Sequence, residues 1–398
     1  MILLIGTTLT ASGDSTEVKK EEPKKTEEPR KAWYQSISLR GYTQVRYNRL
    51  LETNPKLKCD QCDKSWGENG GFFIRRIRLI FSGNVHDRVF MYIQPDLASS
   101  ASSSGLHFAQ IRDAYFDLAL DKNKTTRLRF GQSKVPFGFE NLQSSQNRLP
   151  LDRNDGINSA LSNERDLGVF LYWAPKKIRE RFAYLISSGL KGSGDYGVFG
   201  FGAHNGQTAN RPEANNDPTI VGRLTYPFLI FGKQIIEPGI QAYTGQVILQ
   251  DRKAKGINKE YNYKDERVAA SFVLYPQPFG IQTEWNVGTG PEYDPVSDTI
   301  RQLPLRGGYF QCTYMIKVKD QIIFPFFRTQ YYNGGKKHET DARRYIVKEN
   351  EFGIEWQPFR NFELVAMYTM SDRTFEDSSN KSNHQKGNLL RLQVQFNY

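Results

Sequence analysis

The sequence lacks any long apolar run. Over its 398 residues, no stretch approaches the roughly 18 consecutive apolar residues that a transmembrane helix needs. Apolar residues make up only 38 % of the chain, whereas aromatic residues reach 13 %. This composition excludes a helical membrane protein. A polar chain that is rich in aromatic residues favours a fold of many short strands.

Cysteine is also scarce, which argues against a fold that is stapled by disulfides. Two of the three cysteines form a lone C-x-x-C pair, Cys59 and Cys62. Without a second pair or a nearby histidine a zinc site is weakly supported, and a local disulfide is the expected alternative. No Ser–His–acid or metal spacing occurs, so we expect no enzyme, no metal and no cofactor. The glycine-rich stretch 197–202 is interpreted as a loop, not a nucleotide cradle.

The chain divides into three parts. Residues 1–13 are apolar and then small, which is typical of part of a secretory signal, although the basic start of such a signal is missing. Residues 14–32 consist mostly of Lys, Glu, Pro and Thr and are expected to form a disordered leader. Residues 33–398 are expected to form one domain.

Within this domain, apolar and polar residues alternate with a period of two. Leu39 and Val45, for example, alternate with Arg40, Gln44 and Arg46. Such a pattern predicts strands that lie between lipid and water. About sixteen strands are expected, at 35–47, 72–85, 88–97, 109–120, 126–132, 166–173, 182–189, 219–226, 235–248, 267–275, 279–288, 307–316, 321–332, 351–357, 361–371 and 388–398.

The connections between these segments alternate between short and long. Transmembrane barrels show this pattern, with short turns on the periplasmic side and long loops outside. Ser133–Arg165 is the longest loop without a strand pattern, and we expect it to fold inward and narrow a pore. The other long loops are expected at 49–71, 98–108, 190–218, 249–266, 289–306, 333–350 and 372–387, and Ala174–Arg181 is expected to be a tight turn.

Several segments resemble the phosphate-selective porin O and P family, in the form found in Bacteroidetes. The most specific lies between Gly131 and Gly168, where a Phe-Gly-Phe-Glu loop is followed by Arg-Asp-Leu-Gly. The resemblance implies a trimer of sixteen-stranded barrels in the bacterial outer membrane, surrounded by lipid and lipopolysaccharide. The other similar segments are Phe72–Gly83, Arg112–Leu118, Tyr275–Pro291 and the terminal RLQVQFNY.

The resemblance also implies roles for particular residues. Arg75 and Arg76 match the paired arginines of the family, and Asp113 matches its acidic residue at the constriction. Ser144 and Ser145 match its serines.

Two departures reduce the expectation of strict phosphate selectivity. Asn141 follows Glu140 where phosphate-selective members place a lysine. After the ninth strand there is no Arg-x-Arg-x-Arg run, only Arg252, Lys253 and Lys255.

Arginines on the predicted lumen face are the candidate selectivity residues. The guanidinium stays charged and its fork matches phosphate oxygens. The alternative is that most of these cations balance carboxylates such as Asp96, Asp113 and Asp117. The pore-lining candidates are Arg40, Arg46, Arg75, Arg76, Arg78, Asp113, Arg129, Ser144, Ser145, Arg223 and Arg328, and the constriction-loop candidates are Lys134, Glu140, Asn141, Arg148, Arg153 and Arg165.

The net charge of +11 suits small anions as partners. The sequence therefore predicts a passive outer-membrane channel that favours anions, phosphate or polyphosphate among them, and that does not bind nucleic acid. A general or sugar-type porin is the alternative with the same fold. A soluble, secreted β-rich protein that binds acidic polysaccharide is the alternative from another class.

Overall fold

The computed structural model describes residues 32–57, 70–97, 108–161, 163–254 and 262–398. The expected signal-like segment, nearly all of the expected leader, and both Cys59 and Cys62 lie outside these residues. What the sequence predicts for them stays a prediction.

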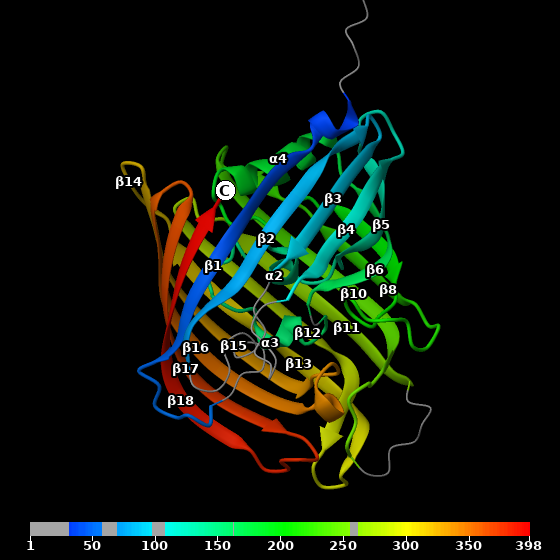
Figure 1. The fold of residues 1–398 in the computed structure, drawn as a ribbon, viewed down its shortest axis with the longest axis vertical. Coiled ribbons are helices and arrows are strands. Elements are labelled where there is room, and N and C mark those ends of the chain that lie inside the picture. The colour runs from blue at the N-terminus through cyan, green and yellow to red at the C-terminus, as the bar shows by residue number, and fades with distance from the viewer. Residues whose placement is uncertain (1–31, 58–69, 98–107, 162, 255–261) are drawn as a thin grey trace, which may run out of the picture.

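The described strands form one antiparallel sheet that closes on itself (Figure 1). β1 (Ser38–Leu50) pairs with β2 (Gly71–His86) on one side and with β18 (His384–Asn397) on the other. The short β9 (Phe228–Ile230) and β14 (Ile316–Val318) continue β8 and β13, because each shares a pairing partner with the strand before it. The result is a closed barrel of 16 strands, as predicted.

The remaining strands follow in chain order around the barrel. The first half contains β3 (Val89–Asp96), β4 (Gln110–Ala119), β5 (Thr126–Lys134), β6 (Arg165–Trp173), β7 (Phe199–His204) and β8 (Thr219–Thr225). The second half contains β10 (Gln234–Ile248), β11 (Asn262–Leu274), β12 (Phe279–Asp294), β13 (Thr299–Tyr314), β15 (Gln321–Gly335), β16 (Arg344–Phe359) and β17 (Phe362–Glu376). Short 3-10 turns occur at η1 (Trp33–Ser36) and η2 (Thr340–Ala342).

Successive residues of a strand face opposite sides of the barrel wall. In β1, Gln44 and Arg46 are buried inside the barrel, whereas Val45 between them is exposed on the outer face. Because side chains alternate across a strand, the period of two in the sequence translates directly into a polar inside and an apolar outside. The predicted faces of the first two strands are therefore confirmed.

The two ends of the barrel differ in their connections. At one end, here called the turn end, the strands are joined by short turns such as 87–88 and 360–361. At the other, the loop end, they are joined by longer segments, of which 135–164 is the longest. This confirms the predicted alternation, with two local exceptions.

The first exception is that several strands extend beyond the predicted ends. β12 and β13 leave only residues 295–298 between them, where a loop over 289–306 was expected. The expected loops 333–350 and 372–387 likewise shrink to 336–343 and 377–383. In these extensions the two faces no longer differ, because Gly290–Tyr293 of β12 are all buried while Arg301 and Gln302 of β13 are both exposed, so the alternation on which the prediction rested disappears.

The second exception is a helix in place of a predicted strand. The segment 182–189 was expected to be a strand and Ala174–Arg181 a tight turn, but α4 (Lys176–Ser187) spans most of both. Ile178, Phe182 and Leu185 are the buried residues of this helix, and their spacing is that of one helix face. The alternation at Phe182, Tyr184 and Ile186 was a misleading signal.

The strand that takes the place of the one expected at 182–189 is β7. It overlaps the glycine-rich stretch 197–202, which was interpreted as a loop. Glycine usually weakens a strand, which led to that interpretation. Here Gly200 and Gly202 face inward, where a Cβ would come within 3.2 Å of the Tyr172 ring and 2.4 Å of the Phe170 ring. The two glycines therefore leave room for large aromatic side chains of β6.

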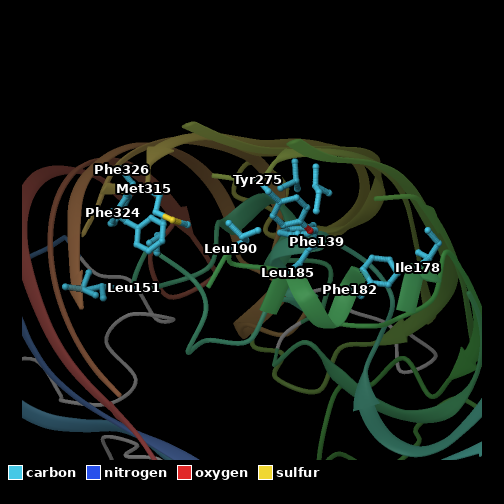
Figure 2. Close-up of a cluster of buried hydrophobic side chains, with 14 of the residues drawn as sticks. Phe139, Leu151, Ile178, Phe182, Leu185, Leu190, Tyr275, Met315, Phe324 and Phe326 are labelled. Carbon is cyan, nitrogen blue, oxygen red and sulfur yellow. The ribbon is translucent and has the colours of Figure 1, made fainter. Parts of the chain in front are cut away.

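Helix α4 lies inside the turn end and packs against the barrel wall (Figure 2). Phe182 and Leu185 belong to a buried apolar cluster with Phe139, Tyr275 and Phe324, of which the last two face inward from the wall. The helix therefore fills one side of the barrel interior with a dry core. None of the described helices has the length and apolar character needed to cross a membrane.

Candidate functional site: a lumen narrowed by an inward loop

The segment 135–164 folds into the barrel, as predicted. It carries two short helices, α2 (Phe139–Leu142) and α3 (Asp155–Asn158), and most of its residues are buried. At Gly156 the segment approaches the backbone of β13 so closely that a Cβ would lie 2.6 Å from the Gly308 nitrogen. We call this segment the constriction loop.

The loop is held at the wall by hydrogen bonds from several strands. The carboxylate of Glu284 accepts bonds from the backbone N–H groups of Phe139 and Glu140, at 2.6 and 2.7 Å. The side chain of Gln330 accepts a bond from the N–H of Asp155 at 2.9 Å. The loop thus crosses the interior and is fixed to strands that lie far from its own ends.

Two bulges bring sequence neighbours to the same side of the wall. The register between β1 and β2 shifts at Gln44, which pairs with Arg76, so that Arg75 is the extra residue. A bulge of this kind redirects a side chain, and both Arg75 and Arg76 consequently reach the lumen. The same shift between β3 and β4 sends both Arg112 and Asp113 inward.

Most of the predicted lumen arginines are paired with carboxylates. Arg78 lies 2.8 Å from Asp96, and Arg129 lies 2.7 Å from Asp117. The remaining pairs are Arg46 with Asp152 (3.1 Å), Arg223 with Glu237 (3.2 Å) and Arg328 with Glu140 (2.7 Å) and Glu351. The side chains of these arginines are buried inside the barrel, and each has a carboxylate partner.

Asp152 on the constriction loop is shared by several arginines. It lies 3.1 Å from Arg46, 2.6 Å from Arg391 and 3.9 Å from Arg75. Arg148 also acts on it electrostatically. Although Arg391 has a second partner in Glu351 at 3.3 Å, one carboxylate cannot neutralise the charges around it.

Arg75 and Arg148, together with the neighbouring Arg76, are here called the arginine cluster. Arg76 is only 5 % exposed and donates to Gln44 at 2.8 Å, and the charges of Arg75 and Arg148 act on it. Arg148 donates to the backbone oxygens of Pro150 and Leu151. Among the described residues, neither Arg76 nor Arg148 has a carboxylate within ion-pair distance.

The arginine cluster also has unused hydrogen-bond donors. Nε of Arg75, Nε of Arg76 and Nη1 of Arg148 are buried, and they have no partner among the described residues. Buried polar groups in folded proteins are nearly always hydrogen-bonded. Buried guanidinium donors that lack partners are therefore suited to receive an anion.

The other predicted constriction residues hold the loop in shape. Arg153 pairs with Glu164 at 2.7 Å, and Arg165 pairs with Asp113 at 2.9 Å. Lys134, at the end of β5, donates to the backbone oxygens of Leu142 and Gln143. Asn141 donates to the backbone oxygen of Ile157, so it links α2 to α3 within the loop.

The two predicted serines lie at different places. Ser145 is buried, with its Oγ 2.6 Å from the hydroxyl of Tyr42 and 3.2 Å from Nη1 of Arg78. Ser144 lines an open cavity on the turn side of the loop. Only Ser144 therefore faces open space.

Charge pairing shifts the ionisation of the loop residues. Burial alone would raise the pKa of Asp152, but Arg46 and Arg391 together hold this pKa below its usual value. Burial is likewise outweighed at Glu164, where Arg153 and Arg165 lower the pKa. Burial lowers the pKa of Arg153 to about 9. Asp152 and Glu164 are thus ionised at neutral pH and act as fixed anchors.

A cavity of about 810 Å³, here called the lower chamber, lies between the constriction loop and the turn end. On the side of the constriction loop it is bounded by Lys134, Leu142 and Ser144. On the side of the turn end it is bounded by turn residues such as Asn123 and Lys124. The strands β1 to β5 supply one side, including Arg40, and α4 supplies the other. A solute that has passed the loop would enter this space.

Sequence reasoning missed several residues of the site. Asp152, Arg112 and Gln44 were not singled out, and no local pattern marks them, because their roles depend on pairing across the barrel. The helix face of α4 was recognisable from the spacing of Ile178, Phe182 and Leu185.

Comparison with known proteins decides the family. Residues 58–398 match the model of a family described as phosphate-selective porin O and P. The chain belongs to this porin family. Comparison of the sequence with curated proteins gives no significant match.

Solved structures with the same fold are distant in sequence. The outer membrane channel DcaP of Acinetobacter baumannii is 14 % identical with a TM-score of 0.55, over 91 % of this chain and 97 % of that chain. An anion-selective porin from Comamonas acidovorans is 9 % identical with a TM-score of 0.51, over 91 % and 99 %. OmpT of Vibrio cholerae is 9 % identical with a TM-score of 0.52, over 91 % and 97 %.

The family and the fold together settle the general activity. The protein is an outer-membrane porin of bacteria, a passive channel and not an enzyme. Because bacterial outer-membrane barrels have short periplasmic turns and long external loops, the turn end is the periplasmic end and the loop end is the external one. The alternative of a soluble, secreted binding protein does not fit this family.

Proposed function

We propose that this porin conducts anions in preference to cations, and that the arginine cluster binds inorganic anions such as phosphate weakly during passage. The observation that carries this proposal is the excess of positive charge beside the constriction loop. Most lumen arginines have a carboxylate partner, whereas Arg76 and Arg148 have none among the described residues and Arg75 has only a distant one.

The physical basis is electrostatic. A narrow, protein-lined lumen screens charge less than bulk water does, so an uncompensated guanidinium attracts anions and repels cations. The unused donors can form charge-assisted hydrogen bonds to an anion's oxygens. Conduction requires that such a site be weak, and the neighbouring backbone and Gln44 contacts already occupy part of each guanidinium.

The test is a recording from purified porin in planar lipid bilayers under a potassium chloride gradient. We expect stepwise conductance and a reversal potential that shows chloride to be more permeant than potassium. We also expect phosphate to reduce the chloride current, because it occupies the arginine cluster. Equal or greater permeability of potassium would contradict the proposal but leave the channel itself intact.

The sugar-type porin is the alternative to be separated in the same recording. Neutral oligosaccharides carry no charge and gain nothing from the arginine cluster. We expect them to leave the chloride current unchanged at concentrations where phosphate reduces it. Block by an oligosaccharide without block by phosphate would favour the sugar-type channel.

We further propose that the porin assembles as a homotrimer, as the family resemblance implies. An apolar groove of about 850 Å³ on the outer face of the barrel supports this assembly, since a second copy can fill it. Its walls include Val45, Ile323, Ile354, Leu392 and Val394. We expect light scattering in mild detergent to give three times the mass of the purified chain. A monomeric mass under these conditions would contradict the assembly.

A further inference from the structure

The lower chamber differs from the arginine cluster in its chemistry. Its β-strand side carries two stacked rings with a guanidinium at each end. The guanidinium of Arg40 lies 6.0 Å from the ring centre of Tyr92, and Tyr92 stacks on Tyr115 with ring centres 5.0 Å apart. The guanidinium of Arg129 lies 3.8 Å from the Tyr115 ring.

This arrangement keeps one cation available to solutes. Arg129 is neutralised by Asp117, whereas Arg40 is exposed and has no carboxylate partner among the described residues. The contact with a tyrosine ring helps to hold a guanidinium in place without cancelling its charge. Arg40 therefore gives the chamber an accessible positive group near the periplasmic exit.

The opposite side of the chamber, formed by α4, carries the charged side chains of Lys176, Arg179 and Glu180 and, beside them, an apolar patch. Helix α4 turns Phe182, Ala183 and Ile186 towards the chamber, and Ile186 is 38 % exposed. Phe90 adds another apolar side chain from the barrel wall. An inorganic anion gains nothing from these apolar side chains, because its interactions are with charges and hydrogen-bond donors. An anion that carries a hydrocarbon body gains from covering it.

We infer that the lower chamber selects organic anions with an apolar or aromatic body, such as aryl carboxylates, over inorganic anions and short polar ones. The carboxylate lies towards Arg40 and the ring lies against the face of α4 that carries Ile186. This inference rests on the proposed anion preference and adds the class of solute. It also gives α4 a role in specificity in addition to filling the barrel.

The test compares block of the chloride current by benzoate, acetate and phosphate, added on the periplasmic side of full-length porin in planar bilayers. Benzoate and acetate carry the same charged group, so a difference between them reports the apolar body. We expect benzoate to reach half-block at a concentration about tenfold lower than acetate, which corresponds to partial burial of one phenyl ring. Equal half-block concentrations would overturn the inference.

Two variants of α4 locate the effect. Ile186→Ser removes an apolar side chain from the chamber, and we expect it to weaken block by benzoate about threefold while block by phosphate is unchanged. Tyr184→Ser is the matched control, because Tyr184 is 49 % exposed on the same helix but does not line the chamber. Equal effects of the two variants on benzoate would overturn the assignment to this chamber.

A third variant tests the charged partner of the carboxylate, and the recordings on the wild-type porin separate this inference from the proposed function. Arg40→Gln is expected to weaken block by benzoate and by acetate alike, because it removes the charged partner of the carboxylate. Pores that prefer potassium to chloride would overturn the proposed function, and this inference with it. Anion-selective pores that do not distinguish benzoate from acetate would overturn the inference alone.

Discussion

Replacing Arg76 with glutamate is expected to abolish the preference for anions. The substitution places a carboxylate where the charges of both Arg75 and Arg148 act on residue 76. The substitution changes the charge of the lumen wall by two units, a few ångströms from a passing ion, and the lumen screens charge poorly. We therefore expect the ratio of chloride to potassium permeability to fall by about tenfold or more. Reversal potentials in a potassium chloride gradient measure this change directly, and the ratio of chloride to potassium permeability should approach or fall below one.

The matched control is Arg301→Glu, which makes the same change of charge at an exposed position near the external end. Because salt screens exposed charges over about 10 Å, its effect on selectivity should be small. Arg76→Lys should retain most of the preference, because it keeps the charge. A selectivity that is unchanged in Arg76→Glu would show that the arginine cluster does not control permeation.

Asp152→Asn is expected to loosen the part of the constriction loop that meets β1 and β18, while the contacts of Glu284 and Gln330 with the loop remain. Asp152 is the carboxylate that joins the loop to Arg46 on β1 and to Arg391 on β18. Removing one partner from a buried ion pair typically costs about 3–5 kcal/mol, because it leaves uncompensated charge behind. The barrel itself is held by its hydrogen-bonded strands, so we expect a folded channel with a higher and noisier single-channel conductance.

Proteolysis gives an independent measure of the same change. Arg148 and Arg153 are buried in the wild type, and we expect trypsin to cut the loop after them faster in Asp152→Asn. Asp294→Asn, at the exposed external hairpin, is the control and should leave the digestion unchanged. An intact loop and a wild-type conductance in Asp152→Asn would show that Asp152 is not the main anchor.

The anchor should also survive mild acid. Because the folded pKa of Asp152 is lowered, its ion pairs contribute fully above the unfolded pKa of about 3.9 and are lost only as the pH falls through the lower folded value. The wild-type conductance should therefore keep its narrow level down to about pH 4.

The sequence predicts the barrel well where two different media impose a pattern on it. Residues such as Gln44, Val45 and Arg46 alternate because one side of the wall is polar and the other apolar. The pattern fails at the ends of β12 and β13, where the two faces of a strand have the same surroundings, and at α4, where an interior helix satisfies a different period. Gly200 and Gly202 were misread because their neighbours Phe170 and Tyr172 could not be known.

The candidate site could be predicted only in part. The inward direction of Arg46 and Arg78 follows from the strand period. That Arg75 also faces inward depends on a bulge, which the local pattern does not reveal, although the family resemblance pointed to the pair. Which arginines are neutralised depends on carboxylates that are distant in sequence, as Asp152 is from Arg391.

The long β12–β13 hairpin has a practical consequence for work on living cells. Each strand has 16 residues, or about 50 Å at roughly 3.3 Å per residue, whereas roughly 9–11 residues suffice to cross the membrane. The tip therefore stands well clear of the lipid, and Val296 on it is 94 % exposed. A short peptide epitope inserted at this position would be displayed to antibodies, at a distance from both the lumen and the outer wall.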